Sequence, residues 1–536
     1  MALEANALID CGERARGEEL YRQAIRINPH LAGAWLGLGR ESMEKGNHAE
    51  GYRCFLRAVA EADIALLEFP NDRPSHVARA LAQNGLFRPA EAVQSARSAL
   101  VIEPDPMLHS ELFFNMNFLP ETTPETHYAE ACRWNSLYAA PLAQQARPHP
   151  NVADAARRLK IGYVSPDLYA HAIMKFLPPI FEFHDRSQFA VTAYSVGRKT
   201  DMLTDMLRNL IEDFVPCPES GVALGERIRA DGIDILVDLG GHTMPWEYFQ
   251  VFALKPAPVQ LSWLGVLSTT GLRTMDYYLG NAEMPCPGTE PYFSETVYRL
   301  PRASYCYRAP IETPVAPSPC RKNGYITFGS FNSPSKIGRD VVRVWSAILR
   351  SVPRSRILLK YRTMNTEVMQ DRFLGWFSKE GIARDRVQFA GLSKIEEYLA
   401  SYGDIDIALD PFPYQGGSTT LDTLWMGVPM VAMSGRTAVQ RGSTSILKLV
   451  GLADMVADSP EQYIKAAEFL AGIVDKIPDL RKNVRQALRS SAYMDERGFT
   501  RELEAAYRDM WRTWCRARNT SDGAHTPEPI SAALRS

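Results

Sequence analysis

The segment DIDIALDPFPYQGGSTTLDTLWMGVPMV, residues 404–431, decides the fold. Its first part is a short apolar run that stops at Asp410, which is typical of a buried β-strand. Gly416 and Gly417 allow a tight turn, and the residues from Ser418 to Trp425 then have the character of a helix. A second apolar run, VPMVAM, follows. A strand, a helix and another strand in this order indicate a parallel sheet, because parallel strands need a crossover connection.

The same alternation extends from Leu159 to about Ala457, in two series. The first series opens with RLKIGYVSPD and continues with FAVTAYSV, IDILVDLGG and PVQLSWLG. The second opens with GYITFGSFN and continues with RILLKYR, RVQFAGL and DIDIALD. We therefore predict an α/β protein with two Rossmann-like domains, over residues 157–318 and 319–517. Ligands of such sheets bind beyond the carboxyl ends of the strands.

Residues 1–120 instead have the pattern of consecutive helices. In AWLGLGRESMEKGNHAEGYRCFLRAV, residues 34–59, Trp35, Gly39, Phe55 and Ala58 occupy packing positions of the tetratricopeptide pattern. We predict two or three such repeats, the first one truncated, which offer a concave surface for a peptide. An unrelated helical bundle is the alternative. Two further segments complete the prediction: a helical linker over 121–156 and a disordered tail over 518–536.

The composition is that of a globular protein, and it argues against a nucleic-acid-binding or membrane-spanning protein. The chain has 536 residues, 46% of them hydrophobic and 23% charged, which is the balance of a globular protein of two to four domains. A net charge of −2 excludes recruitment to nucleic acid by overall basicity. The sequence contains no run of about 18 apolar residues, so no membrane span is expected. Its first residues lack a basic flank before an apolar core, so they are not expected to be a secretion signal. The 8 scattered Cys predict reduced thiols and a cytoplasmic protein.

Two strand ends carry groups that suit a diphosphate. The helix that begins at Ser418 exposes free backbone N–H groups and a partial positive charge, and Thr419 and Thr420 add hydroxyl donors. Simple helix capping is the alternative for this segment. Lys336, in FGSFNSPSKIGRD, follows a predicted strand and could neutralise a leaving group. A solvated surface lysine is the alternative there.

Two histidines lie at other strand ends. His171 follows the strand of RLKIGYVSPD and could act as an acid or base, or orient a hydroxyl. His242 follows Gly240 and Gly241. Glycines at this place indicate that a ligand, for example a sugar, can approach the backbone closely. A structural histidine is the alternative for both.

Six motifs in this order resemble the O-GlcNAc transferase and SPINDLY family, whose members carry tetratricopeptide repeats before a GT-B catalytic region. The resemblance covers about residues 157–514, and its motifs are RLKIGYVSPDLYAH (158–171), ILVDLGGHT (235–243), KPAPVQLSWLG (255–265), TTGLRTMDYYLGN (269–281), FNSPSKI (331–337) and PFPYQGGSTTLDTLWMGVPMV (411–431). It implies an inverting glycosyltransferase that needs no metal or other cofactor and transfers a sugar to Ser or Thr of proteins. No DxD motif stands out.

The resemblance also implies roles for individual residues. Lys336 is similar to the family lysine that contacts the donor diphosphate, and His171 to the family histidine near the acceptor and the sugar. The remaining positions divide into donor-binding residues, namely Gly417, Ser418, Thr419, Thr420, Asp422, Tyr398 and Ser333, and residues beside the sugar or acceptor, namely Thr243, His242, Leu264 and Gly265. Among the donor-binding residues, Asp422 is expected at the ribose and Tyr398 at the base.

Some positions depart from the family pattern. Ser418 and Ser333 stand where animal members have His and Gln, and Tyr398 stands where they have a His. Val266 and Leu267 change the loop beside the sugar. These departures concern the sugar and the base and leave the diphosphate site intact. Asp422 favours the O-GlcNAc transferase pattern over that of SPINDLY, so the expected donor is UDP-GlcNAc, with GDP-fucose or a flagellin-modifying sugar as alternatives.

The expected partners are acceptor proteins bound through the repeats, and a homodimer is possible. Two rival functions are a glycosyltransferase that acts on a lipid or small molecule and a repeat scaffold with an inactive catalytic region.

Overall fold

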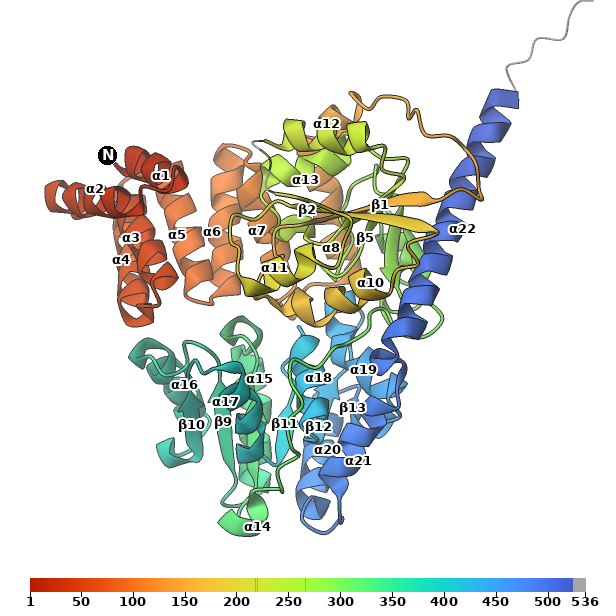
Figure 1. The fold of residues 1–536 in the computed structure, drawn as a ribbon. Coiled ribbons are helices and arrows are strands. Elements are labelled where there is room, and N and C mark those ends of the chain that lie inside the picture. The colour runs from red at the N-terminus through yellow and green to blue at the C-terminus, as the bar shows by residue number, and fades with distance from the viewer. Residues whose placement is uncertain (217, 219, 266, 524–536) are drawn as a thin grey trace, which may run out of the picture. The chain divides into compact units, whose positions relative to one another are not determined.

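The computed structural model describes residues 1–216, 218, 220–265 and 267–523. The chain forms two compact units, each built from separate segments. Unit 1 contains residues 1–137, 282–293 and 307–494, and unit 2 contains residues 138–281, 294–306 and those from 495 onward. Figure 1 labels the elements of both units.

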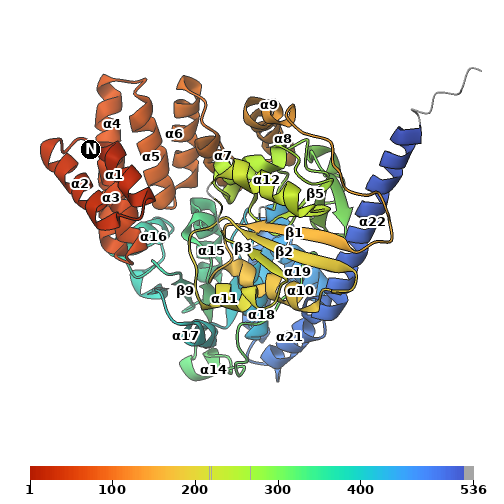
Figure 2. The ribbon, with the colours of Figure 1, turned by 45° about the horizontal axis from the view of Figure 1, so that its top comes forward.

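Unit 1 begins with the helical repeats. Helices α3 and α4 pack closely because Gly39 has no side chain: a Cβ atom there would lie 2.7 Å from the ring of Phe55. The predicted helical-repeat region is thus confirmed, and Gly39 and Phe55, both at predicted packing positions, face each other. Successive helices lie side by side in Figure 2. They are α1 (Ala2–Asp10), α2 (Arg14–Ile27), α3 (Ala32–Glu44), α4 (His48–Glu68), α5 (Arg73–Gly85), α6 (Pro89–Ile102), α7 (Pro106–Met116) and α8 (Pro124–Trp134).

The second part of unit 1 is a parallel sheet in the order β10-β9-β8-β11-β12-β13. Its strands are β8 (Thr327–Ser330), β9 (Arg356–Lys360), β10 (Val387–Ala390), β11 (Ile407–Leu409), β12 (Met430–Met433) and β13 (Val456–Ala457). The helices between and after them are α15 (Arg339–Ser351), α16 (Glu367–Lys379), α17 (Ile395–Ala400), α18 (Ser418–Trp425), α19 (Gly442–Leu449), α20 (Pro460–Ile473) and α21 (Leu480–Arg489). The predicted strand, turn and helix around Asp410 are β11, the following turn and α18.

The repeats and this sheet share one hydrophobic core. Buried Tyr52 and Leu86 of the repeats belong to the same cluster as Trp345 and Phe373, which come from helices of the sheet layer. Arg372 also donates a hydrogen bond to the carbonyl oxygen of Leu86 at 2.6 Å. Continuous burial of this kind explains why the repeats fall into one unit with the second Rossmann-like domain.

Unit 2 is a second parallel sheet, in the order β3-β2-β1-β4-β5-β6-β7. Its strands are β1 (Leu159–Ser165), β2 (Phe189–Ser195), β3 (Asp213–Val215), β4 (Ile235–Asp238), β5 (Val259–Ser262), β6 (Tyr277–Gly280) and β7 (Thr296–Arg299). Its helices include α10 (Leu177–Phe183), α11 (Met202–Arg208), α12 (Gly221–Asp231) and α13 (Trp246–Ala253). The predicted fold class, α/β with two Rossmann-like domains after an all-α segment, is confirmed.

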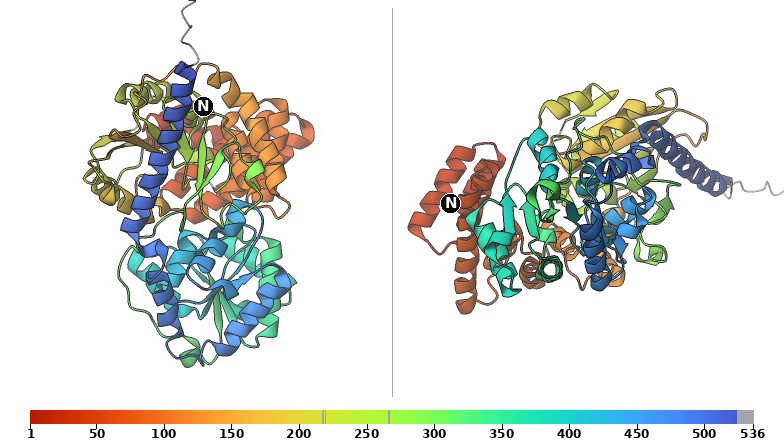
Figure 3. Two further views of the ribbon diagram at one scale, coloured as in Figure 1. Left: turned by 90° about the vertical axis from the view of Figure 1, so that its right-hand side faces the viewer. Right: turned by 90° about the horizontal axis from the view of Figure 1, so that it is seen from below.

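The long helix α22 (Glu496–Gly523) belongs to unit 2 rather than to the sheet that precedes it in sequence (Figure 3). Tyr507 and Tyr163 are joined by a hydrogen bond of 3.0 Å between their hydroxyls, and Glu504 lies 3.0 Å from the ring of His184. The predicted boundaries differ from this arrangement. Residues 282–293 and 307–318, expected in the first Rossmann-like domain, belong to unit 1. The domain expected over 319–517 gives up its last helix, and residues 518–523, expected in a disordered tail, continue that helix.

No helix among the described residues is long and apolar enough to cross a membrane.

Candidate functional site

The turn after β11 in unit 1 is fixed by a buried carboxylate. Both oxygens of Asp410 accept a hydrogen bond from the backbone N–H of Gly416, at 3.0 and 3.1 Å. Burial raises the pKa of Asp410 to about 6, and hydrogen bonds and the charge of Lys336 oppose that shift. A Cβ atom on Gly416 would lie 2.5 Å from the hydroxyl oxygen of Thr420. The turn therefore needs glycine at this position, and it delivers the chain to the start of α18.

The start of α18 divides the predicted hydroxyl groups into two kinds. Ser418 and Thr419 are half-buried, and Thr419 donates to the side-chain oxygen of Asn332 at 3.1 Å. Thr420 is buried, and its hydroxyl lies 2.6 Å from that of Ser443. Gly417 is the residue before the helix, so the first helical N–H groups have no acceptor within the helix. These N–H groups and two of the three hydroxyls are thus gathered where an anion would bind.

Lys336 lies against this same turn, although it is 79 residues away in sequence. It ends a short helical turn, Pro334–Lys336, that follows β8, with half-buried Ser333 just before it. Its Nζ donates to the carbonyl oxygen of Gln415 at 2.8 Å and lies 4.2 Å from the centre of the Tyr414 ring. Burial lowers its pKa to about 8. The structure therefore brings a cation to the turn that leads into α18.

Asp422 is not at the surface of α18. It is fully buried, and its carboxylate accepts hydrogen bonds from the hydroxyls of Tyr307 at 2.8 Å and Tyr398 at 3.1 Å. Tyr398 also lies 3.0 Å from the hydroxyl of Tyr402. Burial raises the pKa of Tyr398 well above its usual value, so the phenol keeps the proton that it donates. Asp422 thus holds Tyr398 in place.

The corresponding turn in unit 2 follows β4. Buried Asp238 accepts from the backbone N–H groups of Gly240 at 2.9 Å and Gly241 at 2.7 Å. Burial raises its pKa to about 6. Thr243 is exposed at the end of this turn and donates to the carbonyl oxygen of Gly240. His242 is buried, and its Nε2 lies 2.8 Å from the carbonyl oxygen of Thr270. This contact with the backbone fits a structural histidine.

The end of β5 is pressed against that turn. A Cβ atom on Gly265 would lie 2.7 Å from the backbone atoms of Leu239 and Gly240. Leu264 has a positive φ of 66°, a conformation that is uncommon for non-glycine residues and is often found at functional sites. The predicted change at Val266 lies outside the described residues, and Leu267 is half-buried.

His171 lies at the end of β1 and is exposed. Its Nδ1 is 3.9 Å from a carboxylate oxygen of Asp167 and 3.5 Å from the N–H of Ile173. Because β1, β4 and β5 are neighbours in the sheet, the residues that follow them share one edge. The structure thus brings His171, Thr243 and Leu264 to the carboxyl edge of unit 2.

Sequence reasoning missed several supporting residues. Glu295 is buried and accepts hydrogen bonds from the hydroxyls of Thr269 and Thr270 and from the N–H of Thr270, which fixes the loop after β5. Tyr402 could have been found from its spacing, because it lies four residues after Tyr398 in a helical segment. Glu295 has no comparable signal in the sequence.

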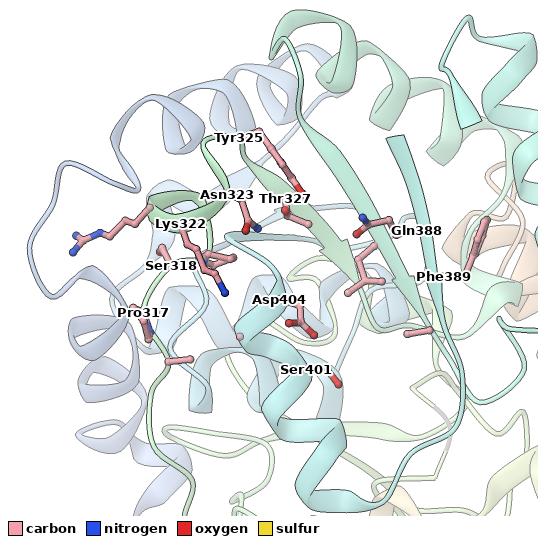
Figure 4. A pocket seen from close by; sticks show the side chains of 16 residues that line it. Pro317, Ser318, Lys322, Asn323, Tyr325, Thr327, Gln388, Phe389, Ser401 and Asp404 are labelled. Carbon is pink, nitrogen blue, oxygen red and sulfur yellow. The ribbon is translucent and has the colours of Figure 1, made fainter. Parts of the chain in front are cut away.

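A hollow of about 860 Å³ in unit 1 lies away from these groups (Figure 4). Its lining includes Thr327, Gln388 and Asp404. Thr327 is the first residue of β8, and Asp404 precedes β11, so the hollow extends toward the amino ends of these strands. None of the predicted donor-binding residues lines it. Within the part of the chain that the structure describes, no group of three His, Cys, Asp or Glu side chains could hold a metal ion.

Comparisons with known proteins find similarity to one family of glycosyltransferases. Residues 138–306 and 321–503 match glycosyl transferase family 41. The chain is 35% identical over 409 residues to a protein of Petunia hybrida described as a probable UDP-N-acetylglucosamine–peptide N-acetylglucosaminyltransferase SPINDLY, over 75% of this chain and 44% of that protein. It is 27% identical over 372 residues to the corresponding protein SEC of Arabidopsis thaliana, over 67% of this chain and 38% of that one. The chain therefore spans less than half the length of these relatives.

A solved structure matches nearly the whole chain. It is a lysine-to-methionine mutant of the O-GlcNAc transferase of Thermobaculum terrenum, with 34% sequence identity and a TM-score of 0.86. The match covers 96% of this chain and 98% of that one.

Proposed function

The chain belongs to glycosyl transferase family 41, and we propose that it transfers N-acetylglucosamine from UDP-N-acetylglucosamine to Ser or Thr hydroxyls of acceptor proteins. The observation that carries this proposal is the position of Lys336, whose ammonium group lies 2.8 Å from the turn that starts α18. A cation and a helix start converge there on one small region. That combination suits the two phosphates of a nucleotide sugar.

The reaction needs a stabilised leaving group. The acceptor oxygen forms a bond to the anomeric carbon, while the bond from that carbon to the diphosphate oxygen breaks and its electron pair stays on the diphosphate. Lys336, the first N–H groups of α18 and the hydroxyls of Ser418 and Thr419 would stabilise this charge. Thr420 contributes only its backbone, because its hydroxyl is engaged with Ser443. These groups supply the positive field without a metal, and attack from the opposite face inverts the anomeric centre.

Unit 2 would supply the groups for the sugar and the acceptor. Thr243, Leu264 and Gly265 present a tightly packed backbone edge after β4 and β5. His171 is exposed at the end of β1 and can either accept the proton of the attacking hydroxyl or orient that hydroxyl. The pH–rate profile of His171→Ala separates the two roles. If His171 is the base, the acidic limb of the profile changes shape relative to that of the unmodified chain; if His171 only orients the hydroxyl, the shape stays the same.

The helical repeats would bind the acceptor. The relatives from Petunia and Arabidopsis are described as peptide-modifying enzymes, and the repeats of this chain form a stack whose surface suits an extended peptide. Transfer of labelled sugar into proteins of a whole lysate, and not into lipid, is the expected result. Label found only in the lipid fraction would contradict this part of the proposal.

A second donor is supported by one observation. Tyr398 stands where, by the resemblance to the family, animal members have a histidine at the base. GDP-fucose is therefore the alternative donor. A thermal-shift comparison of UDP, GDP and CMP distinguishes the two, since a ligand at a hundred times its dissociation constant stabilises a protein by about 2.7 kcal/mol. Stabilisation by GDP but not by UDP would replace the proposed donor, and no stabilisation by either would contradict the proposed function.

A further inference from the structure

An aromatic contact joins the helical-repeat region to the turn that carries the proposed donor site. Phe118 lies just after α7, and its ring stacks on that of Tyr414, with centroids 5.0 Å apart and planes inclined by 19°. Tyr414 belongs to the turn between β11 and α18. The same ring lies 4.2 Å from the Nζ of Lys336. The Tyr414 ring is therefore in contact with both the helical repeats and Lys336.

The ammonium group of Lys336 stays in one position only if other groups hold it there. A lysine side chain has four rotatable bonds and loses much conformational freedom when its ammonium is held. Two contacts hold it here, the hydrogen bond to the Gln415 carbonyl and the face of Tyr414. Both come from the same turn, so the position of the ammonium group depends on how firmly that turn and the ring of Tyr414 are held.

Phe118 supplies that support from outside the sheet. It is held in turn by Phe114 of α7, whose ring lies edge-on at 5.5 Å. A second contact fastens the same region close by: Glu125, in the first turn of α8, pairs with Arg436 after β12 at 2.8 Å. That pair is largely exposed, so we expect it to contribute less than the aromatic stack.

We propose that Phe118 and Tyr414 are positioning residues for Lys336, so that the helical-repeat region completes the donor site. This inference rests on the proposed function. Burial raises the pKa of Tyr414 to about 12 and lowers that of Lys336 to about 8, as expected for a cluster from which water is largely excluded. The repeats would then serve the donor as well as the acceptor.

The test is the affinity for UDP, measured by calorimetry on the full chain. Phe118→Leu keeps an apolar side chain but removes the ring, and we expect affinity to fall about tenfold. Phe118→Tyr keeps the stack and should restore affinity to within about twofold of the original. Phe87→Leu is the matched control. Phe87 also joins the repeats to the sheet, between Tyr52 and Tyr361, but it does not contact Tyr414. Its loss should leave UDP affinity unchanged.

A double-mutant cycle separates positioning from general loosening. In a Lys336→Met background, Phe118→Leu should cause no further loss of UDP affinity, because the group that it positions is already absent. An equal loss in both backgrounds, or no loss in either, would overturn the inference. If Phe118→Leu does not fold, Tyr414→Leu takes its place in the same cycle. Failure of the unmodified chain to bind UDP or GDP would instead contradict the proposed function itself.

Discussion

The turns after β4 and β11 have the same structure in the two domains. In each sheet the strand lies next to the first strand of its domain, on the side away from the second. Each turn contains a buried aspartate, Asp238 or Asp410, whose carboxylate accepts from glycine N–H groups. Burial raises the pKa of both aspartates to about 6. Both domains therefore use a buried carboxylate to shape the backbone where a ligand would bind.

The two turns differ in what they present. The turn after β11 ends in a helix of eight residues and lies against Lys336. The turn after β4 ends in the short helical turn Gly241–Thr243, where the ring of His242 is fixed to a backbone carbonyl. A helix start with a lysine suits an anion, whereas a tightly packed backbone with a hydroxyl suits a neutral sugar. The chemistry of such a turn is therefore set by the residues around it, because the buried aspartate and the glycines are common to both.

Removal of Lys336 should take away most of the ability of the turn after β11 to stabilise an anion. We expect Lys336→Met to lower kcat by about 10²–10³, because the leaving diphosphate loses its main positive partner. Thermal stability without nucleotide should not fall, since burial opposes the charge on this lysine. Lys322→Met is the control. Lys322 lines the hollow in Figure 4, and its replacement should leave kcat unchanged. Turnover near that of the unmodified chain would refute the role of Lys336.

The two aspartates offer a comparison of stability. Their pKa values lie near 6 in the folded chain, above the ordinary value of 3.8, so the ionised form opposes folding. The favourable contribution is complete below pH 4 and is lost as pH rises through about 6. Asp238→Asn removes this dependence and should raise the free energy of unfolding at pH 8 by up to about 3 kcal/mol.

Asp410→Asn should gain about as much, because the pKa of Asp410 is raised to the same value even with the charge of Lys336 beside it. Urea unfolding of both variants at pH 4.5 and pH 8 measures both gains. A gain that is independent of pH at either site would refute the raised pKa value of that aspartate.

Donor binding should depend on pH through the lysine in unit 1. Lys336 has a pKa of about 8, and only its protonated form attracts the diphosphate. Affinity for UDP should therefore begin to decrease as pH approaches 8 and fall by up to about tenfold per pH unit above it. Calorimetry between pH 7 and 9.5 measures this limb. In Lys336→Met the limb should be absent, and a limb that persists there would belong to another group.

Much of both turns could be predicted from sequence, because glycines, hydroxyls and a lysine next to apolar runs are local signals. Their partners could not. Tyr307 and Asp422 are 115 residues apart, and Thr420 meets Ser443 only because α18 and α19 pack together. The expected role of Asp422 at the ribose therefore came without its partners Tyr307 and Tyr398, which only the fold brings to its carboxylate. The contact of Phe118 with Tyr414 is equally invisible before the repeats are packed on the sheet.

The smallest expected effect separates two adjacent threonines that the sequence treats alike. Thr419 is half-buried beside Asn332, whereas the hydroxyl of Thr420 faces Ser443 inside the unit. Thr419→Val should lower UDP affinity about fivefold, because the hydroxyl would exchange its hydrogen bond to Asn332 for a stronger one to the charged phosphate, and only the difference is lost. Thr420→Val should leave affinity almost unchanged and instead lower thermal stability, because Ser443 loses its buried partner. The reverse result would mean that α18 turns by one residue when nucleotide binds, and it would assign the phosphate contact to Thr420.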